Sequence, residues 1–448
     1  MKKLFFTVLA TCLLTPAFGA NIAVIDSGLD YRHDGLDGHI WKNAAELEDG
    51  RDNDGNGYQD DIYGWNFSGP DNKVIDYRYL GTFSPDVNRY FEIQGRMLLG
   101  TATETEIAWL RERQSNQEFI AQLQKFGNFV HGTHVAGIAV ANSASQAMGV
   151  KIIPTEVIPT MNALKSSTKS VQNDELRIAI VKHALLALAN QQMLLLEEVA
   201  IYVHQRGSDV ANGSFGTGAA QAKMIGGALL KLALGRDATE AELNDVAKHF
   251  LTALIEGGQR MVRRAPNTLF VFAAGNDGSN NDVMPTSPAN VRADNVITVA
   301  ATYDNQFLAR FSNYGATMVD VAAPGMLINS TIPGDGYMEV SGTSQAAPFV
   351  ANIAARVKEM NPALTPADIK RIILGTVDMK AFLAGKVLSG GLVNGNRAVM
   401  AGQLSRTLAM PEAMTRARAQ VRDVESTRTI IHPSKKVEAM PLLPQFRL

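Results

Sequence analysis

Short runs of apolar residues place the strongest constraint on the fold of this chain. The clearest run, 21–25, leads directly into Asp26, and runs of the same character occupy 269–273 and 296–300. A fourth candidate lies at 318–322. Uninterrupted apolar runs of this length are typical of strands that are buried on both faces, as in parallel sheets. Because helix-like stretches separate the runs, the sequence predicts an α/β layered fold with a mostly parallel sheet.

The composition is that of a globular protein. The chain has 448 residues, of which 46% are hydrophobic and 19% are charged, and its formal net charge is -2. This amount of apolar material is enough for a large buried core and excludes wholesale disorder. A nearly neutral chain has no general attraction to nucleic acid or to an anionic membrane, so neither is expected as a partner.

The first 20 residues have the pattern of a signal peptide. A short basic start at 1–3 precedes an apolar run at 4–14, and 15–20 supplies small residues and a proline. Residues 1–20 are therefore expected to be removed. The alternative is an uncleaved anchor, but the apolar run is too short to span a bilayer comfortably. We expect export, to the periplasm or out of the cell, and no membrane contact after cleavage.

Cys12, the only cysteine, lies within that apolar run. The residues before it faintly resemble the motif of a lipid-anchored cysteine, although Thr11 is the wrong kind of residue just before the cleavage point. Without Cys12 the mature chain can form no disulfide. An exported protein of this sequence must then be stabilised in another way.

Three stretches, near 91–124, 174–205 and 219–264, have the composition of helices inserted into the α/β fold. The second starts at Asp174, a candidate cap, and the third contains a capping-box pattern at 239–242. The two interpretations are helices that pack on the core surface, and a lid or partner-binding surface. None of the three is expected to be apolar enough to span a membrane.

The chain changes character at about residue 403. The stretch 403–448 carries several arginines and has three prolines near its end. We expect a loosely attached C-terminal extension, and a regulatory or docking segment is the alternative. The main domain is therefore expected to span 21–402.

Ser344 lies in the segment SGTSQAAP at 341–348, which leads into a stretch of helical composition at 349–355. Pro348 is tolerated in the first turn of a helix, so Ser344 is expected at a helix start. There the free N–H groups and the positive end of the helix dipole would face a nucleophile and a developing oxyanion. By itself, the segment also fits an ordinary serine cap.

His131 opens the segment HGTHVAG at 131–137, which places two histidines at the start of a second small-residue helix. A serine hydroxyl needs an adjacent base, usually an imidazole, and that imidazole needs a carboxylate to fix its tautomer. Asp26, at the end of a buried strand, suits that task. Metal binding by His131 and His134 is the competing interpretation, but no thiol or matching acidic pair lies nearby. We expect His134 to be structural.

Four segments of the chain together resemble the subtilisin-like serine protease family. They are VIDSG at 24–28, HGTHVAG at 131–137, AAGNDG at 273–278 and GTSQAAP at 342–348, in the family's order of Asp, His, Asn and Ser. Matching sequence also links and closes them, at 311–315, 321–325 and 392–395. The resemblance covers about 21–402 outside the insertions. It implies a three-layer subtilisin-like α/β fold, with a mostly parallel sheet flanked by helices.

The resemblance also implies roles for single residues. Asp26 would orient His131, His131 would act as general base and acid, and Ser344 would attack the carbonyl carbon of a peptide bond. Asn276 would donate its amide N–H to the oxyanion, together with the backbone N–H of Ser344. The alternative for Asn276 is an ordinary turn residue. These roles require no cofactor for catalysis.

The segment NGSFG at 212–216 resembles the family's substrate-binding strand, to which an extended peptide adds by main-chain hydrogen bonds. Ser214 and Gly216 are the candidate contacts, and Gly275, beside Asn276, is a third. A plain turn from strand to loop is the alternative.

An acidic segment at 52–61 is a second chemical candidate. Asp52, Asp54, Asn56 and Asp60 place hard oxygen ligands around a glycine, as in the first half of an EF-hand-like Ca²⁺ loop. The bidentate glutamate expected at the twelfth position is missing, because a tyrosine stands there. Calcium commonly stabilises enzymes of the family that the chain resembles. A structural Ca²⁺ site and a solvated acidic turn therefore both stay open.

The sequence thus predicts a secreted serine endopeptidase that cleaves protein or peptide substrates through an acyl-enzyme. The alternatives are a catalytically silent binding or scaffold protein of the same fold, and peptide ligation on the same acyl-enzyme. No oligomeric state is indicated. The short stretch before Asp26 leaves no room for the family's propeptide, so folding assistance and latency are expected to come from elsewhere. Gln345 stands where the family often has Met, a change that activity should survive.

Overall fold

A central, mostly parallel sheet organises the molecule. The computed structural model describes residues 19–155 and 173–426. The strands of the central sheet are β1 (Asn21–Asp26), β2 (Gly64–Asn66), β3 (Gln146–Lys151), β4 (Val210–Gly213), β5 (Leu269–Ala273), β6 (Val296–Tyr303), β7 (Phe307–Leu308), β8 (Val321–Pro324), β11 (Asp378–Met379) and β12 (Gly391–Leu392). Their order across the sheet is β11-β12-β8-β6-β5-β4-β1-β3-β2, and β7 pairs with β6. Only β7 and β11 pair antiparallel to their neighbours within the described sheet. A separate antiparallel hairpin joins β9 (Ile328–Ile332) and β10 (Gly336–Val340).

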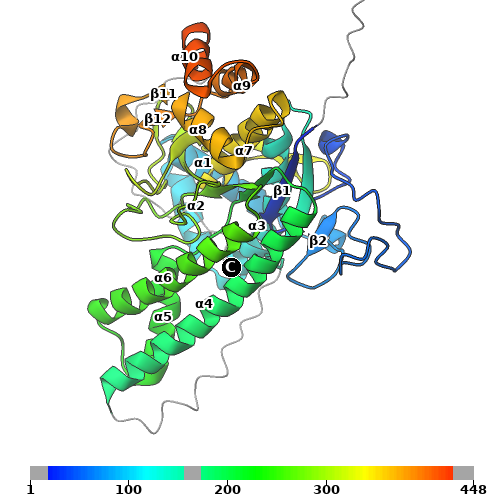
Figure 1. The fold of residues 1–448 in the computed structure, drawn as a ribbon. Coiled ribbons are helices and arrows are strands. Elements are labelled where there is room, and N and C mark those ends of the chain that lie inside the picture. The colour runs from blue at the N-terminus through cyan, green and yellow to red at the C-terminus, as the bar shows by residue number, and fades with distance from the viewer. Residues whose placement is uncertain (1–18, 156–172, 427–448) are drawn as a thin grey trace, which may run out of the picture.

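Helices cover both faces of this sheet (Figure 1). They are α1 (Pro85–Leu98), α2 (Glu104–Ser115), α3 (Gln117–Val140), α4 (Asp174–Gln205), α5 (Ala219–Leu234), α6 (Glu240–Arg264), α7 (Thr343–Met360), α8 (Pro366–Gly375), α9 (Gly395–Leu404) and α10 (Met410–Gln420). Figure 1 shows α4, α5 and α6 projecting together from the side of the sheet opposite α7, α8 and α9.

Alternate side chains of each strand enter two different cores. Phe270 and Phe272 of β5 are fully buried in a cluster with residues of α4, α5 and α6. Leu269 and Val271 of the same strand point the other way, into a cluster with residues of α7, α8 and α9. This two-sided burial explains why the strands read as uninterrupted apolar runs. The predicted three-layer α/β fold is confirmed.

The predicted strands occur, with one shift. Strands β1, β5 and β6 begin where the apolar runs at 21, 269 and 296 begin. The fourth run predicts a strand over 318–322, but β8 begins only at Val321. Asp320, just before it, is held to β6 by both its backbone and its side chain: its N–H donates to the Thr298 carbonyl oxygen at 2.9 Å, and its carboxylate accepts the Thr298 N–H at 2.8 Å.

The three helical stretches differ in detail from their prediction. The stretch 174–205 is α4 over its whole length, but its cap is Asn173, whose side chain accepts the N–H groups of Glu175 and Leu176. The stretch 219–264 is two helices, and the capping box forms at Thr239 to start the second of them. The stretch 91–124 contains most of α1, all of α2 and the beginning of α3. Helix α3, which packs on the central sheet, therefore begins inside the stretch that was expected to be an insertion.

The long helix α4 also corrects an expectation about membranes. It is long and apolar enough to cross a bilayer by length and composition, with a mean hydropathy of 1.3 in its best 18-residue window. It is the one such helix in the described residues. Val181, Leu185 and Leu196 on one of its faces pack with α6 in the core cluster. A single helix that passes this test is weak evidence for a membrane span.

The C-terminal region is not loosely attached as far as residue 426. Helix α10 buries Ala413 and Ala417 completely. Beyond it, the Val421 carbonyl oxygen accepts from buried Arg397 of α9 at 2.9 Å, and the N–H of Val424 donates to buried Asp378 at 2.7 Å. These contacts hold 403–426 against the domain, contrary to the prediction. The rest of the predicted extension, 427–448, and most of the predicted signal peptide lie outside the described residues.

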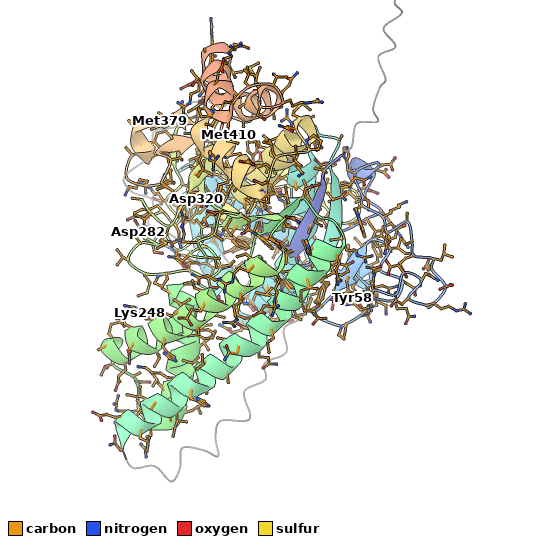
Figure 2. The ribbon with its side chains drawn as sticks, in the orientation of Figure 1. Tyr58, Lys248, Asp282, Asp320, Met379 and Met410 are labelled. Atoms are coloured by element: carbon orange, nitrogen blue, oxygen red, sulfur yellow. The ribbon has the colours of Figure 1, made fainter. Side chains whose placement is uncertain are left out.

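A buried carboxylate with two cationic partners links separate elements of a chain that has no cysteine after residue 12. The carboxylate of Asp320 (Figure 2) is fully buried and lies 3.0 Å from Arg292 and 3.5 Å from Lys370. Lys370 belongs to α8, so the pair ties this helix to the sheet next to β8. Burial lowers the pKa of Lys370, and the nearby Asp320 carboxylate opposes that shift.

Candidate active site

Three neighbouring parallel strands bring the predicted site residues to one edge of the sheet. Asp26 is the last residue of β1, Ser214 directly follows β4, and Asn276 lies three residues beyond β5. Strand β4 lies between β1 and β5, and all three run parallel. Their carboxyl ends therefore meet at the same edge, where open α/β sheets place their ligands.

His131 reaches this edge from α3, but not from the start of the helix as the sequence predicted. Helix α3 begins at Gln117, capped by the side chain of Asn116, and His131 lies in its middle. The residues from 117 to 125 are mostly good helix formers, and the helix that they start runs on through 126–130 to His131 without a break. Val135 and Ala136, one turn beyond His131, pack with Val24 of β1 and fix α3 against that strand.

Asp26 and His131 form a short, buried contact. The Nδ1 of His131 lies 2.6 Å from Oδ1 of Asp26, and both side chains are almost completely buried. The same carboxylate oxygen accepts the backbone N–H of Ser27 at 2.7 Å. Since a carboxylate can only accept here, Nδ1 of His131 carries a hydrogen. In the neutral imidazole Nε2 is then the basic nitrogen.

Ser344 is the second residue of α7, as predicted, at the positive end of the helix. Pro348 is the sixth residue of α7, so it lies beyond the first turn in which it was expected. Because proline has no N–H, it leaves the carbonyl oxygen of Ser344 without its intrahelical donor. The hydroxyl of Ser214 donates to this oxygen instead, at 2.9 Å, and Oγ of Ser344 lies 3.2 Å from the Ser214 carbonyl oxygen.

Thr343 fixes the orientation of Asn276. The Oδ1 of Asn276 accepts the backbone N–H of Thr343 at 2.8 Å and its hydroxyl at 2.9 Å. The amide oxygen is therefore occupied, and Nδ2 is the part of the side chain left to donate. Thr343 belongs to the predicted serine segment, but no local pattern predicts its contact with Asn276.

Gly275 is required by its surroundings. Its φ is +109°, in a region that favours glycine, and its N–H donates to the Thr343 hydroxyl at 3.1 Å. A Cβ at this position would lie 2.5 Å from Nδ2 of Asn313. Asn313 in turn accepts the backbone N–H of Asp277 at 2.9 Å, so it holds the loop that carries Asn276. Asn313 lies in the matching segment 311–315, for which the sequence predicts no role.

The predicted substrate contacts line one small cavity at Ser344. Its wall includes Ser214, Gly216, Gly275 and Asn276 as well as Ser344 itself. Strand β4 ends at Gly213, so Ser214 and Gly216 lie in the loop beyond the strand. A Cβ on Gly216 would lie 2.4 Å from the Ser287 carbonyl oxygen, so only glycine lets the two backbones approach this closely.

His134 connects α3 to the β9–β10 hairpin. Its Nε2 lies 3.1 Å from the Ile328 carbonyl oxygen and 2.9 Å from that of Met338. Both partners can only accept, so Nε2 carries the hydrogen. Burial lowers the pKa of His134 to about 4, which keeps the ring neutral near pH 7. Gln345 approaches Nδ1 of this ring at 3.5 Å, so α3 and α7 converge beside Ser344.

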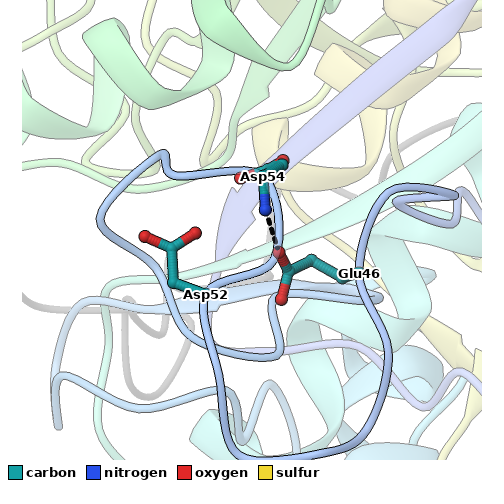
Figure 3. A group of neighbouring side chains, drawn as sticks. All are labelled: Glu46, Asp52 and Asp54. Atoms are coloured by element: carbon teal, nitrogen blue, oxygen red, sulfur yellow. Dashed lines mark hydrogen bonds between the residues drawn. The ribbon is translucent and has the colours of Figure 1, made fainter.

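The acidic segment folds into a loop whose carboxylates gather differently from the prediction (Figure 3). Glu46, Asp52 and Asp54 each place a carboxylate oxygen within 4.8 Å of the others. Glu46 was missed, because it precedes the motif. Asp60 is not in this group, whereas Asn56 borders it, because its backbone N–H lies 3.1 Å from the carboxylates of both Asp52 and Asp54. The Asn56 side-chain oxygen accepts the N–H of Tyr58, and Asp60 accepts those of Asp49 and Gly50.

Arg206 and Tyr58 attach this loop to α4 and its C-terminal end. Arg206 lies 2.6 Å from the Asp54 carboxylate, and the hydroxyl of Tyr58 (Figure 2) donates to Glu198 at 3.2 Å. Burial opposes ionisation of Asp54, but the Arg206 and Asn43 hydrogen bonds outweigh it and hold the pKa of Asp54 below its usual value.

Comparison with known proteins identifies similar sequences. A family model described as "Subtilase family" matches residues 18–395. The thermophilic serine proteinase of Bacillus sp. (strain AK1) is 30% identical over 269 residues, which are 60% of this chain and 52% of that protein. The alkaline elastase YaB of Bacillus sp. (strain YaB) is 42% identical over 112 residues, 25% of this chain and 28% of that protein. An extracellular protease of Xanthomonas campestris pv. campestris is 41% identical over 142 residues, 30% of this chain and 24% of that protein. The chain thus spans about half of the first of these relatives and less of the others.

Solved structures align with most of the chain at low identity. A cold adapted subtilisin-like serine proteinase is 21% identical, with 84% of this chain and 88% of that chain covered and a TM-score of 0.45. A lanthipeptide protease is 17% identical, with 85% and 86% covered and a TM-score of 0.47. Because these identities and TM-scores are low, the fold assignment depends on the strands and helices described above and not on these structures.

Proposed function

This chain belongs to the subtilase family, and from that premise we propose that it is a serine endopeptidase that hydrolyses peptide bonds of protein or peptide substrates. The observation that carries the proposal is the buried contact of 2.6 Å between His131 and Asp26. It lies at the sheet edge that also holds Ser344 at a helix start and the loop of Asn276. The relatives named as proteases support the same activity.

In the proposed mechanism, Asp26 holds His131 in the tautomer whose Nε2 is basic. His131 then takes the proton of Ser344 as its oxygen attacks the carbonyl carbon of the substrate. The oxyanion accepts hydrogen bonds from Nδ2 of Asn276 and from the backbone N–H of Ser344. The tetrahedral intermediate collapses, His131 gives its proton to the leaving amine, and an acyl ester remains on Ser344. Water, deprotonated by His131, hydrolyses that ester.

A fluorophosphonate probe tests this proposal. We expect it to label Ser344, located by mass spectrometry of the digested protein, and we expect the unlabelled protein to hydrolyse casein. A silent scaffold protein would show neither result. Peptide ligation would appear as joined products when a second peptide amine is supplied, and hydrolysis as free carboxylates.

Asn276→Ala is expected to lower kcat by about 10²–10³-fold with little change in KM, because it removes an oxyanion donor that acts mainly in the transition state. Steady-state kinetics on a peptide substrate measure both constants. Ser279→Ala, in the same loop, is the matched control and should leave kcat within about twofold. An Asn276→Ala enzyme with unchanged kcat would contradict the assigned role.

We also propose that Glu46, Asp52 and Asp54 hold a structural Ca²⁺. Their carboxylate oxygens are hard ligands of the kind that Ca²⁺ prefers, and they converge within 4.8 Å. Backbone N–H groups orient them already: Glu46 accepts those of Asn53 and Asp54 at 2.7 and 3.0 Å. Arg206 neutralises part of the charge at Asp54, so this ligand set is only moderately anionic.

Calcium is therefore expected to stabilise the fold without entering the reaction. At a Ca²⁺ concentration about 100 times Kd, the free energy of unfolding should rise by about 2.7 kcal/mol. Thermal unfolding with Ca²⁺ and with chelator measures the difference. Glu46→Gln should remove most of the shift, and Glu425→Gln, outside the loop, should keep it. Equal melting temperatures with and without chelator would contradict the calcium site and indicate a solvated acidic turn.

Export is the third part of the proposal. It is supported by the signal-peptide pattern of 1–20 and by a relative that is named as an extracellular protease. N-terminal sequencing of the protein recovered from periplasm and medium would locate it and show whether 1–20 has been removed. Recovery of an intact N-terminus in the cytoplasm would contradict export.

A further inference from the structure

A second cavity, of about 450 Å³, lies between α1 and the β9–β10 hairpin. It shares no lining residue with the cavity at Ser344. Gly95 allows the close fit of its two walls, because a Cβ there would lie 3.0 Å from a methyl carbon of Leu327. One wall is α1, which begins at Pro85 and extends into the stretch 91–124 that was expected to be an insertion. The other is the hairpin that runs directly into the Ser344 segment.

The cavity carries negative charge that no described side chain neutralises. Glu92 of α1 and Glu339 of β10 both line it, and both are exposed. Neither forms an ion pair within residues 19–155 and 173–426. The cation in the lining, Arg96, is already paired with Glu106 at 2.7 Å. Two unpaired carboxylates therefore line the cavity. The one guanidinium in its lining, that of Arg96, is neutralised by Glu106, which does not line the cavity.

The rest of the lining combines apolar side chains with the amides of Asn88 and Asn329. Phe91, Leu99, Leu327, Ile332 and Met338 are buried or half-buried and form much of the wall. A lysine or arginine side chain matches both features at once. Its aliphatic stem packs on apolar surface, and its charged head reaches carboxylates at the solvent edge.

The cavity lies within reach of a substrate held at Ser344. Glu339 precedes Ser344 by five residues, so their Cα atoms are at most about 18 Å apart. The hairpin is also fixed relative to the site: the N–H of Leu327 donates to the Ser341 hydroxyl at 2.9 Å, and that of Gly342 to the Gly325 carbonyl oxygen at 2.8 Å. An extended peptide advances about 3.3 Å per residue. A side chain within about five residues of the scissile bond can reach Glu339.

We propose that this cavity is a substrate subsite that binds a lysine or arginine side chain of the polypeptide, a few residues from the scissile bond. Glu92 and Glu339 bind the charged head, and the apolar wall binds the stem. The inference rests on the proposed peptidase function for its substrate. It adds to that function a preference for a basic side chain, which residues of α1 and of the β9–β10 hairpin produce together.

The test uses internally quenched peptides of one sequence, in which a single lysine or glutamine is moved through the positions on both sides of the cleaved bond. At one position lysine should raise kcat/KM over glutamine by about three- to tenfold, the range expected for two partly exposed ion pairs. The Glu92→Gln/Glu339→Gln double variant should lose this preference and keep its rate on the glutamine peptide. Glu104→Gln, an exposed carboxylate that does not line the cavity, should retain it.

Binding to the Ser344→Ala variant separates this inference from the activity. The affinity of the lysine and glutamine peptides is measured by fluorescence anisotropy, where no cleavage is needed. A lysine preference that disappears in the triple variant with Glu92→Gln and Glu339→Gln supports the subsite even if the wild-type protein hydrolyses nothing. Equal affinities at every position, or a preference that survives both substitutions, overturn it. Absence of probe labelling and of hydrolysis overturns the peptidase proposal alone.

Discussion

Ser344→Ala is expected to lower kcat by about 10⁶-fold, the loss typical when the nucleophile of a serine–histidine–aspartate triad is removed. The other hydroxyls that line this cavity in the described residues are already engaged in hydrogen bonds, and that of Thr286 donates to Asn281 at 3.2 Å. The hydroxyl of Thr343 donates to Asn276, and that of Ser214 donates to the Ser344 carbonyl oxygen. Both are held away from the substrate carbonyl by these bonds. Hydrolysis of a fluorogenic peptide, followed for hours at high enzyme concentration, measures the residual rate.

The variant should fold normally, because the lost contact of Oγ with the Ser214 carbonyl oxygen is long, at 3.2 Å. A melting temperature close to that of the wild type would show this. A residual rate of about 10³–10⁴ over the uncatalysed reaction is expected, since Asn276 and the helix N-terminus remain. If Ser344→Ala kept more than about a hundredth of the wild-type rate, another residue would have to be the nucleophile.

The sheet-edge part of the site follows from sequence reasoning alone. The apolar run of 21–25 predicts a strand that ends at Asp26, and the run of 269–273 predicts one that ends just before Asn276. Parallel strands place such ends at one edge, so a short motif after each strand is enough to bring the side chains together. Ser344 at a helix start follows from the small residues and the proline after it in the same way.

The parts that sequence reasoning missed depend on contacts between distant segments. His131 was placed at a helix start because the small residues at 131–137 look like a beginning. The residues before them are equally helical, so the pattern contains no boundary there. Arg397 anchors the C-terminal region through a backbone carbonyl at Val421, and no local pattern marks a carbonyl as an anchor. Glu46 likewise joins Asp52 only because the loop closes on itself.

Asp26→Asn is expected to lower kcat by about 10⁴-fold while leaving the fold intact. One oxygen of Asp26, Oδ1, now contacts both Nδ1 of His131 at 2.6 Å and the backbone N–H of Ser27 at 2.7 Å. An asparagine whose Nδ2 takes this position donates to Nδ1 of His131 and gives up the Ser27 contact. The imidazole is forced into the tautomer with hydrogen on Nε2, which cannot take the Ser344 proton. The loss is in kcat, because positioning of the substrate does not change.

A nearby buried carboxylate provides the control. Asp30 accepts the hydroxyl of Tyr77 at 2.8 Å and the N–H of Gly334 at 2.9 Å, and it has no contact with His131 in the described structure. Asp30→Asn should therefore lower the melting temperature and leave kcat close to the wild-type value. Asp26→Asn should do the reverse, with a loss of kcat far larger than its fall in melting temperature can explain. If both variants lost activity only in proportion to stability, Asp26 would be a structural carboxylate and His131 would need another group to set its tautomer.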